Sequence, residues 1–531
     1  MNSKISLTID LSHIKNLMLF ATIGWFMYLW ILSGNAWLHP ELLGTAAYIW
    51  ANPEGETIFQ LLRKVFDWMA FDPNVNRVRP LNDVVEVVDA VARPYLTYLI
   101  GPHPSLTPSA ILTAILAPTF LYHYIRRNLG KASLAALMLC LFFISSTGFL
   151  STIVCYIRPA KKLNLVFLCM SLYFGARLAD KGTIKDFSLF YGSLLASFFS
   201  DELGLSNYVI CGLLFWESIL KSTPWKRTLY LLLPLIFLAL TKWMLPFIYK
   251  LFSIHGAWDA LRDPKKFAVF GYLLEPEFYR ASLSQTARSF LSTIGIYKHV
   301  FWTELSVLIV LFTVPIWQII RLRHRTLLEM LKDKLIISTL LVFVVSIYAT
   351  LLDWYPFPHE ISYLGSFNYY YHSSVVVMII LWLCFFWQNL SEMLMIKQKI
   401  LPAFYLFSFI MGITIIIANF YLFQKVNKLV QIIHSYPFSM RSLHSELYKL
   451  NKKQFTANNP ITFLTQREQV LGNFHSTLRK VFGRRWQENG FFQTFNLIAP
   501  TPIMSSAHIN HLVNAYYPFL HMKVEIEDTR N

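Results

Sequence analysis

Three cationic side chains lie within five residues in the stretch STIVCYIRPAKKLNLVF, which begins at Ser151. Arg158, Lys161 and Lys162 stand between two hydrophobic runs, and Pro159 lies among them. Cations near helix ends can donate charge-assisted hydrogen bonds to an anionic group such as a diphosphate. The same residues could also contact the phosphates of membrane lipids. The stretch therefore predicts either an anion-binding site or a lipid contact at a membrane boundary.

Two further pairs of titratable residues could take part in chemistry. Asp201 and Glu202, in the segment SDEL, begin an apolar run, where they could cap a helix, orient an acceptor or contact a metal ion. His359 and Glu360 lie in DWYPFPHEISYLGSFNYYYH, whose aromatic rings suit sugar stacking or an interfacial belt. No segment has the spacing of a tetrahedral zinc site, and the His–Glu pair lacks the second His of HExxH. A divalent ion such as Mg²⁺ or Mn²⁺ is therefore an optional partner.

These residues belong to a chain with the composition of a polytopic membrane protein. Of 531 residues, 55% are hydrophobic and only 15% are charged, which is too few charges for a soluble protein of this length. Aromatic residues make up 16%, as suits lipid-facing helices with interfacial belts. The net charge of +17 indicates basic loops facing anionic lipid headgroups and argues against a nucleic-acid partner. The five cysteines lie in hydrophobic runs without metal spacing, and we interpret them as inert thiols.

Eleven apolar runs approach the ~20 residues that a helix needs to cross the hydrocarbon core of a bilayer. They cover residues 17–34, 105–125, 132–156, 163–178, 187–200, 203–219, 228–247, 303–320, 335–352, 374–390 and 403–423. We therefore predict an all-α polytopic fold with about 11 transmembrane helices. The first helix is expected to be retained, because no small-residue cleavage site stands out after it.

The distribution of basic residues predicts the orientation of these helices. With the N-terminus in the cytoplasm, every cytoplasmic loop carries Lys or Arg, as the positive-inside rule requires. The segments then placed outside are residues 35–104, 248–302, 353–373 and 424–531. The cluster from Arg158 to Lys162 also faces outward, where it departs from the rule. We predict a transmembrane domain over 1–423, with 248–302 as an outer cap. A small C-terminal extracytoplasmic domain over 424–531 would hold a helix near 463–483 and a strand near 521–527.

The first outer loop contains a stretch with helical periodicity, LNDVVEVVDAVARPYL. The apolar residues of its one face are Leu81, Val84, Val85, Val88 and Val91. Asp83, Glu86 and Asp89 fall on other faces, and Arg77 and Arg79 precede the stretch. Such an amphipathic helix between two membrane spans is expected to lie along the membrane interface.

The order of these features resembles the GT-C class of integral-membrane glycosyltransferases, and its protein-O-mannosyltransferase-like branch in particular. NRVRPL at 76–81 is similar to the Arg-x-Arg-Pro-Leu stretch in the first outer loop of many bacterial members. FFSDELGL at 198–205 resembles a Ser-Lys-Glu-x-Gly element at a helix end. SFNYYYHSS at 366–374 resembles a Glu-Arg-Tyr-x-Tyr-x-x-Ser element that opens a late helix, with Asn368 where Arg is usual. The resemblance covers roughly residues 15–425.

This resemblance implies a sugar donor linked to a polyprenyl phosphate or diphosphate, used at the extracytoplasmic face of a bacterial inner membrane. The residues implied to stabilise the leaving phosphate are Arg158, Lys161, Lys162, Arg77 and Arg79. A carboxylate is implied to take the proton of the acceptor hydroxyl, and the family often places an Asp just after the first membrane helix. That region here, SGNAWLHPELLGTAAYIW, has no Asp.

Glu41 is the nearest acid to that position and is our first candidate for the base, with Asp67, Asp72 and Asp83 as alternatives. The acceptor, an unidentified glycan, lipid or protein, is expected near Asp201, Glu202, His359 and Glu360.

Two other classes of membrane protein stay open. A lipid-linked oligosaccharide flippase or transporter would carry charges within its helices and an internal two-fold repeat, whereas these charges cluster in outward loops. An O-antigen ligase-like enzyme would share the diphosphate donor and the outward cations but lack an interfacial helix in the first loop. The sequence therefore predicts a membrane glycosyltransferase ahead of both.

Overall fold

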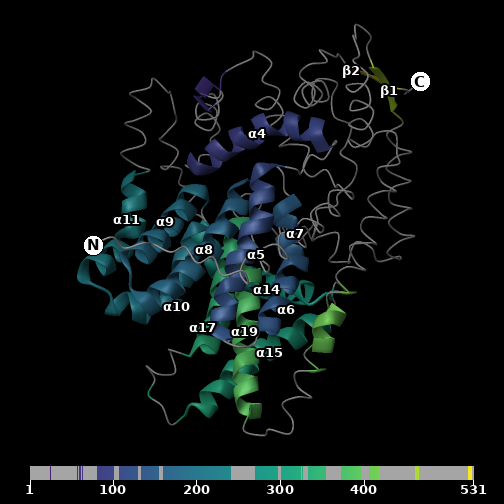
Figure 1. The fold of residues 1–531 in the computed structure, drawn as a ribbon. Coiled ribbons are helices and arrows are strands. Elements are labelled where there is room, and N and C mark those ends of the chain that lie inside the picture. Colours follow the sequence, from purple (N-terminus) through teal and green to yellow (C-terminus); the bar gives the residue numbers. More distant parts are fainter. Residues whose placement is uncertain are drawn as a thin grey trace.

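The computed structural model of the chain is a bundle of helices (Figure 1). It describes residues 80–100, 107–129, 133–154, 159–201, 203–240, 269–296, 301–323, 333–354, 372–395, 461–465 and 524–528, and the isolated positions 24, 57, 59–60, 62–63, 326, 406–407, 409–415 and 417–418. The helices in the main ranges are α4 (Pro80–Ile100), α5 (Pro108–Leu129), α6 (Ser133–Ser145), α7 (Thr147–Val154), α8 (Pro159–Lys181), α9 (Ile184–Ser200), α10 (Gly204–Lys221), α11 (Pro224–Ala239), the 3₁₀ helix η3 (Val269–Leu274), α14 (Pro276–Thr293), α15 (Phe301–Arg321), α17 (Lys334–Trp354) and α19 (Ser373–Met395).

Six of the described helices are long and apolar enough to cross a membrane, as expected of a multi-pass membrane protein. These candidate spans are Pro108–Leu129, Ala160–Asp180, Leu203–Lys221, Phe301–Arg321, Lys334–Leu352 and Ser373–Met393. Each coincides with a predicted run. The predicted run 187–200 forms α9, and 228–247 begins as α11. The run 17–34 lies outside the described residues except for Gly24, so the count of 11 stays a prediction.

The predicted single span over 132–156 was wrong in one respect, because the chain breaks into α6 and α7 at Ser146. The hydroxyl of Ser146 donates to the carbonyl of Phe143 at 2.6 Å and accepts from the backbone N–H of Phe149 at 3.3 Å. A serine hydroxyl that bonds to its own backbone offers the chain an alternative to the helical ladder. It ends α6 and caps the start of α7.

Neighbouring helices run in opposite directions: the end of α9 meets the start of α8, and the ends of α15 and α19 meet the start of α17. At one end, which we call the lysine end, contacts join the first turns of α5, α8, α10 and α19. The opposite end carries Arg127 paired with Asp180, and Arg177 paired with Asp186 at 2.8 Å. This basic end is the one that the positive-inside rule would place in the cytoplasm.

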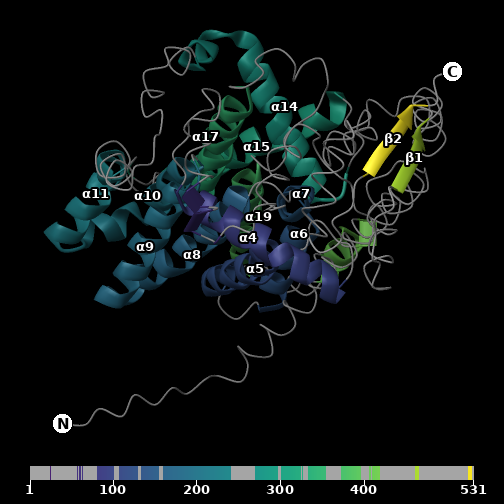
Figure 2. The ribbon, with the colours of Figure 1, turned by 90° about the horizontal axis from the view of Figure 1, so that it is seen from above.

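Helix α4 lies across the lysine end of the bundle, over α5 and α8 (Figures 1 and 2). The helix was predicted from its periodicity. Asn82, Val87 and Asp89 are buried, whereas Val84 and Val88 are exposed. An exposed valine row on a helix that covers the bundle fits a position along the membrane interface. The buried side of α4 thus brings hydrogen-bonding groups to the lysine end.

Helix α14, part of the predicted outer cap, packs among α7, α15, α17 and α19. Phe278, near the start of α14, contacts Leu351. The ring centre of Phe290, near its end, lies 5.6 Å from the ring centre of Trp382 in the middle of α19. Its buried side also holds polar residues: Ser282, Gln285, Thr286, Ser289, Ser292 and Thr293. Part of the segment 248–302 is therefore packed into the bundle, and its role as a cap stays a prediction.

Two strands are described near the C-terminus. β1 (Ile461–Thr465) pairs in parallel with β2 (Val524–Asp528). β2 agrees with the strand predicted near 521–527. The helix predicted from 463 was wrong for its first residues, because Phe463, Leu464 and Thr465 belong to β1. Whether 424–531 forms one domain stays a prediction.

A close approach between α7 and α19 depends on Gly148. A methyl group placed there would come within 2.5 Å of a methyl carbon of Val376. We expect Gly148→Ala to lower the free energy of unfolding by about 1–3 kcal/mol through overpacking. The control is Gly192→Ala on α9, where nothing lies within 4 Å, and which should be neutral or slightly stabilising. Thermal unfolding in detergent measures both, and equal midpoints for the two variants would contradict this packing.

Candidate functional site

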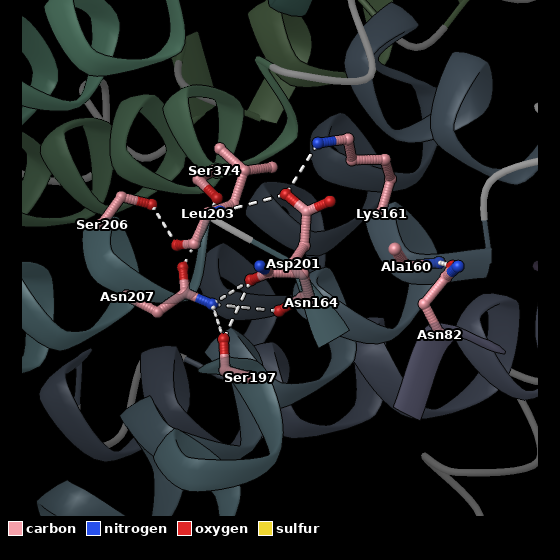
Figure 3. A network of polar contacts seen from close by, with 10 residues as sticks. All are labelled: Asn82, Ala160, Lys161, Asn164, Ser197, Asp201, Leu203, Ser206, Asn207 and Ser374. Atoms are coloured by element: carbon pink, nitrogen blue, oxygen red, sulfur yellow. Dashed lines mark hydrogen bonds and ion pairs between the residues drawn. The ribbon is translucent and has the colours of Figure 1, made fainter. Parts of the chain in front are cut away.

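A fully buried ion pair joins α8 to the end of α9 at the lysine end. The Nζ atom of Lys161 lies 2.7 Å from Oδ1 of Asp201, and both side chains are 0% exposed (Figure 3). Lys161 stands in the first turn of α8, behind Pro159, whose fixed φ suits the first position of a helix. A buried ion pair costs several kcal/mol of desolvation for each ion, so it is weak evidence for stability alone.

Asp201 also builds the turn between α9 and α10. Its backbone N–H donates to the carbonyl of Ser197 at 3.1 Å, and its Oδ1 accepts from the backbone N–H of Leu203 at 3.0 Å. The N–H of Gly204 then donates to the carbonyl of Asp201 at 2.9 Å. The carboxylate therefore fixes the start of α10 and holds Lys161 at once. The sequence prediction had treated helix capping and a functional role as alternatives.

Lys162 points toward a second buried carboxylate through two hydroxyl groups. Its Nζ lies 3.5 Å from Oγ1 of Thr107, which is 3.1 Å from Oγ of Ser109. Asp89 of α4 accepts from both the backbone N–H of Ser109, at 2.9 Å, and its hydroxyl. Lys162 is 0% exposed and Asp89 is 2% exposed. The bonds between Asp89 and Ser109 therefore tie α4 to the start of α5. The Thr107 hydroxyl lies between Ser109 and Lys162.

One turn after Lys161, a buried polar network joins four helices (Figure 3). Asn207 of α10 donates to the Oδ1 of Asn164 on α8 and, at 2.7 Å, to the hydroxyl of Ser197 on α9. The Ser197 hydroxyl donates to the same Oδ1 at 3.1 Å. Ser374 of α19 donates to Asn207 at 3.5 Å. Such a network sets the rotation of each helix about its axis, because an unmatched amide in a low-dielectric interior is costly.

The lysine end holds two buried lysines and two buried carboxylates, Asp89 and Asp201, whose formal charges balance, so a positive potential there would come from the helix N-termini. Helix N-termini carry roughly half a positive charge each, and α5, α8, α10 and α19 all begin here. Asn82 of α4 supplies only a neutral oxygen to the first turn of α8, accepting from the N–H of Ala160 at 2.8 Å. The arrangement is chemically suited to hold an anion. Lys161 and Lys162 are both 0% exposed in the described structure.

No family model, curated protein or solved structure matches the chain. The geometry alone must carry the functional argument.

The structure brings together part of the predicted site. Lys161, Lys162 and Asp201 lie at one end of the bundle. Asp83 belongs to α4, but its side chain is not among those described. The predicted site residues outside the described part of the chain are Glu41, Asp67, Asp72, Arg77, Arg79, Arg158, Glu202, His359 and Glu360. Their roles stay predictions. Among the described residues, no group of three or more His, Cys, Asp or Glu could hold a metal ion, and a Mg²⁺ or Mn²⁺ partner also stays a prediction.

Sequence reasoning missed the neutral members of this site. Asn164 and Asn207 each lie in a candidate membrane span, and a polar residue in a spanning segment usually faces the protein interior. That rule was available and would have found both. Asp89 was treated only as part of a polar helix face.

Proposed function

We propose that this protein is a membrane glycosyltransferase that moves a sugar from a polyprenyl-phosphate-linked donor to an acceptor at the extracytoplasmic face. The observation that carries the proposal is the pair of fully buried lysines, Lys161 and Lys162, among converging helix N-termini beneath α4. Ionisable residues buried in a membrane bundle are expensive and mark functional sites. A phosphate group presented from the bilayer is the kind of anion this position would meet.

The chemistry assigns separate tasks to cations and carboxylates. The acceptor oxygen attacks the anomeric carbon as a carboxylate takes its proton, and the bond from that carbon to the phosphate oxygen breaks. The electron pair leaves with the phosphate, whose charge the two lysines stabilise. Asp201 is engaged by Lys161 and Asp89 by Ser109, so both position other groups. The base remains a proposal among Glu41, Asp67, Asp72 and Asp83, with Glu41 first.

Binding of farnesyl phosphate to the detergent-purified protein tests the donor site, with farnesol as the uncharged control. We expect Lys162→Gln to weaken binding of farnesyl phosphate at least tenfold, because a charge-assisted hydrogen bond contributes about 1.5–3 kcal/mol. The matched control is Lys221→Gln at the opposite end of the bundle, where the lysine is exposed and pairs with Glu217. Equal affinity of wild type and Lys162→Gln, or equal affinity for farnesol, would refute a phosphate site at these lysines.

A flippase is the second candidate, favoured by the buried polar side of α14. Thr350 of α17 donates to the Oε1 of Gln285 at 2.7 Å. Nε2 of Gln285 and Oγ of Ser346 are buried polar atoms without a partner in the described part of the chain. A polar strip inside a bundle is what a translocated headgroup would require. Reconstituted protein distinguishes the two: sugar transfer without lipid translocation supports the enzyme, and translocation without transfer supports the flippase.

A further inference from the structure

The first turns of α5, α8, α10 and α19, which meet at the lysine end, receive different hydrogen-bond acceptors. A carboxylate accepts from the first turn of α5, where Asp89 binds the N–H of Ser109. Asp201 accepts from the backbone N–H of Leu203, directly before α10. The first turn of α8 has the neutral oxygen of Asn82. For α19, no carboxylate among the described residues accepts from the first turn. Like that of α8, the first turn of α19 therefore has no backbone N–H bonded to a carboxylate among the described residues.

Two buried polar atoms without partners lie at this end of α19. The hydroxyl of Ser373, the first residue of α19, is 1% exposed as a side chain and has no hydrogen-bond partner in the described structure. The Nδ2 atom of Asn164 is likewise buried and unpaired there. Asn164 is connected to α19 through Asn207, which contacts both Asn164 and Ser374 (Figure 3). Buried donors are normally satisfied, so each of these two atoms is suited to donate to an acceptor oxygen of a ligand.

We propose that the amino end of α19 is a phosphate-binding element that acts together with Lys161 and Lys162. The backbone N–H groups of the first turn, the hydroxyl of Ser373 and the amide nitrogen of Asn164 would donate to phosphate oxygens. Lys161 stands one turn before Asn164 on α8, so charged and neutral donors come from one helix face. The inference rests on the proposed function, for which it names the lipid-linked phosphate as the ligand of this element.

Replacing Ser373 by Asp separates a structural role from a binding role. A carboxylate in the first turn favours the helix dipole, whereas burying it costs desolvation energy, so the thermal midpoint alone does not separate the two roles. With a purely structural α19, the folded variant should bind phosphate unchanged. In a phosphate site, the same carboxylate repels the ligand. We expect Ser373→Asp to weaken farnesyl phosphate binding at least tenfold, measured by calorimetry on the folded variant in detergent. Thr223→Asp, at the start of α11, is the matched control and should bind like wild type.

Two further variants keep the test decisive if Ser373→Asp fails to fold. Ser373→Ala removes one donor to a charged group and should weaken binding about tenfold, whereas Ser373→Thr retains the hydroxyl and should restore most of the affinity. Wild-type affinity in Ser373→Asp or Ser373→Ala would overturn the inference. If Lys162→Gln still loses binding in that case, the proposed donor site stands without α19. A wild type that binds neither farnesyl phosphate nor inorganic phosphate overturns the phosphate element itself, and sugar transfer then decides the proposed function separately.

Discussion

Asp201→Asn is expected to be among the most destabilising single substitutions at the lysine end. The change removes the charge that faces the buried Nζ of Lys161 at 2.7 Å but keeps an oxygen for the N–H of Leu203. Breaking one partner of a buried ion pair typically costs about 3–5 kcal/mol, because the other charge loses its compensation inside the protein. Unfolding of the purified protein by titration with SDS should therefore show a large loss of stability.

The double variant Lys161→Met, Asp201→Asn identifies the cause. Removal of both charges should recover most of the loss, since replacing an entire buried pair is often neutral. The coupling energy from the four variants should exceed 1 kcal/mol, as a rough lower bound for residues in one network. Asp180→Asn is the matched control at the other end, where an exposed carboxylate pairs with Arg127 and the effect should be about 0–1 kcal/mol. Strictly additive single effects of the Lys161 and Asp201 changes would mean that the pair carries no special energy.

The long apolar helices were accessible from sequence because hydropathy is a local property. The run 335–352 matches the span Lys334–Leu352, and 303–320 matches Phe301–Arg321. The break at Ser146 was not accessible in the same way, because one serine in an apolar run is compatible with a continuous helix. What ends α6 is the bond from the Ser146 hydroxyl to its own backbone, together with the glycine that lets α7 approach α19. A hydropathy profile does not reveal a hydrogen bond between a serine hydroxyl and its own backbone.

The candidate site was accessible only in part for a different reason. A cluster such as Lys161 and Lys162 stands out in an apolar context, and the sequence therefore led to the right end of the bundle. The partner of Lys161 lies 40 residues away, and its identity depends on how α8 and α9 rotate against each other. That rotation is set by the contacts of Asn164, Ser197 and Asn207, which sequence periodicity does not resolve. The buried side of α4 was not accessible for a similar reason: amphipathicity indicates two faces but does not say which one meets the protein.

Acidification is expected to destabilise the protein through His372, which directly precedes α19. The imidazole is 1% exposed, and burial lowers its pKa from 6.5 to about 3. Because the folded-state pKa lies below the unfolded one, protons bind preferentially to the unfolded chain. The contribution to stability is complete above pH 6.5 and is lost as the pH falls toward 3. At pH 5 the loss is about 2 kcal/mol by linkage.

Thermal midpoints between pH 8 and pH 5 measure this effect directly. His372→Gln removes the titrating group and should flatten that part of the profile. A wild-type midpoint that is constant down to pH 5, or a His372→Gln variant with the wild-type slope, would contradict a neutral buried imidazole. The same neutrality bears on the site. At physiological pH the amino end of α19 would attract a phosphate through its backbone N–H groups, Ser373 and the lysines, with no charge contributed by His372.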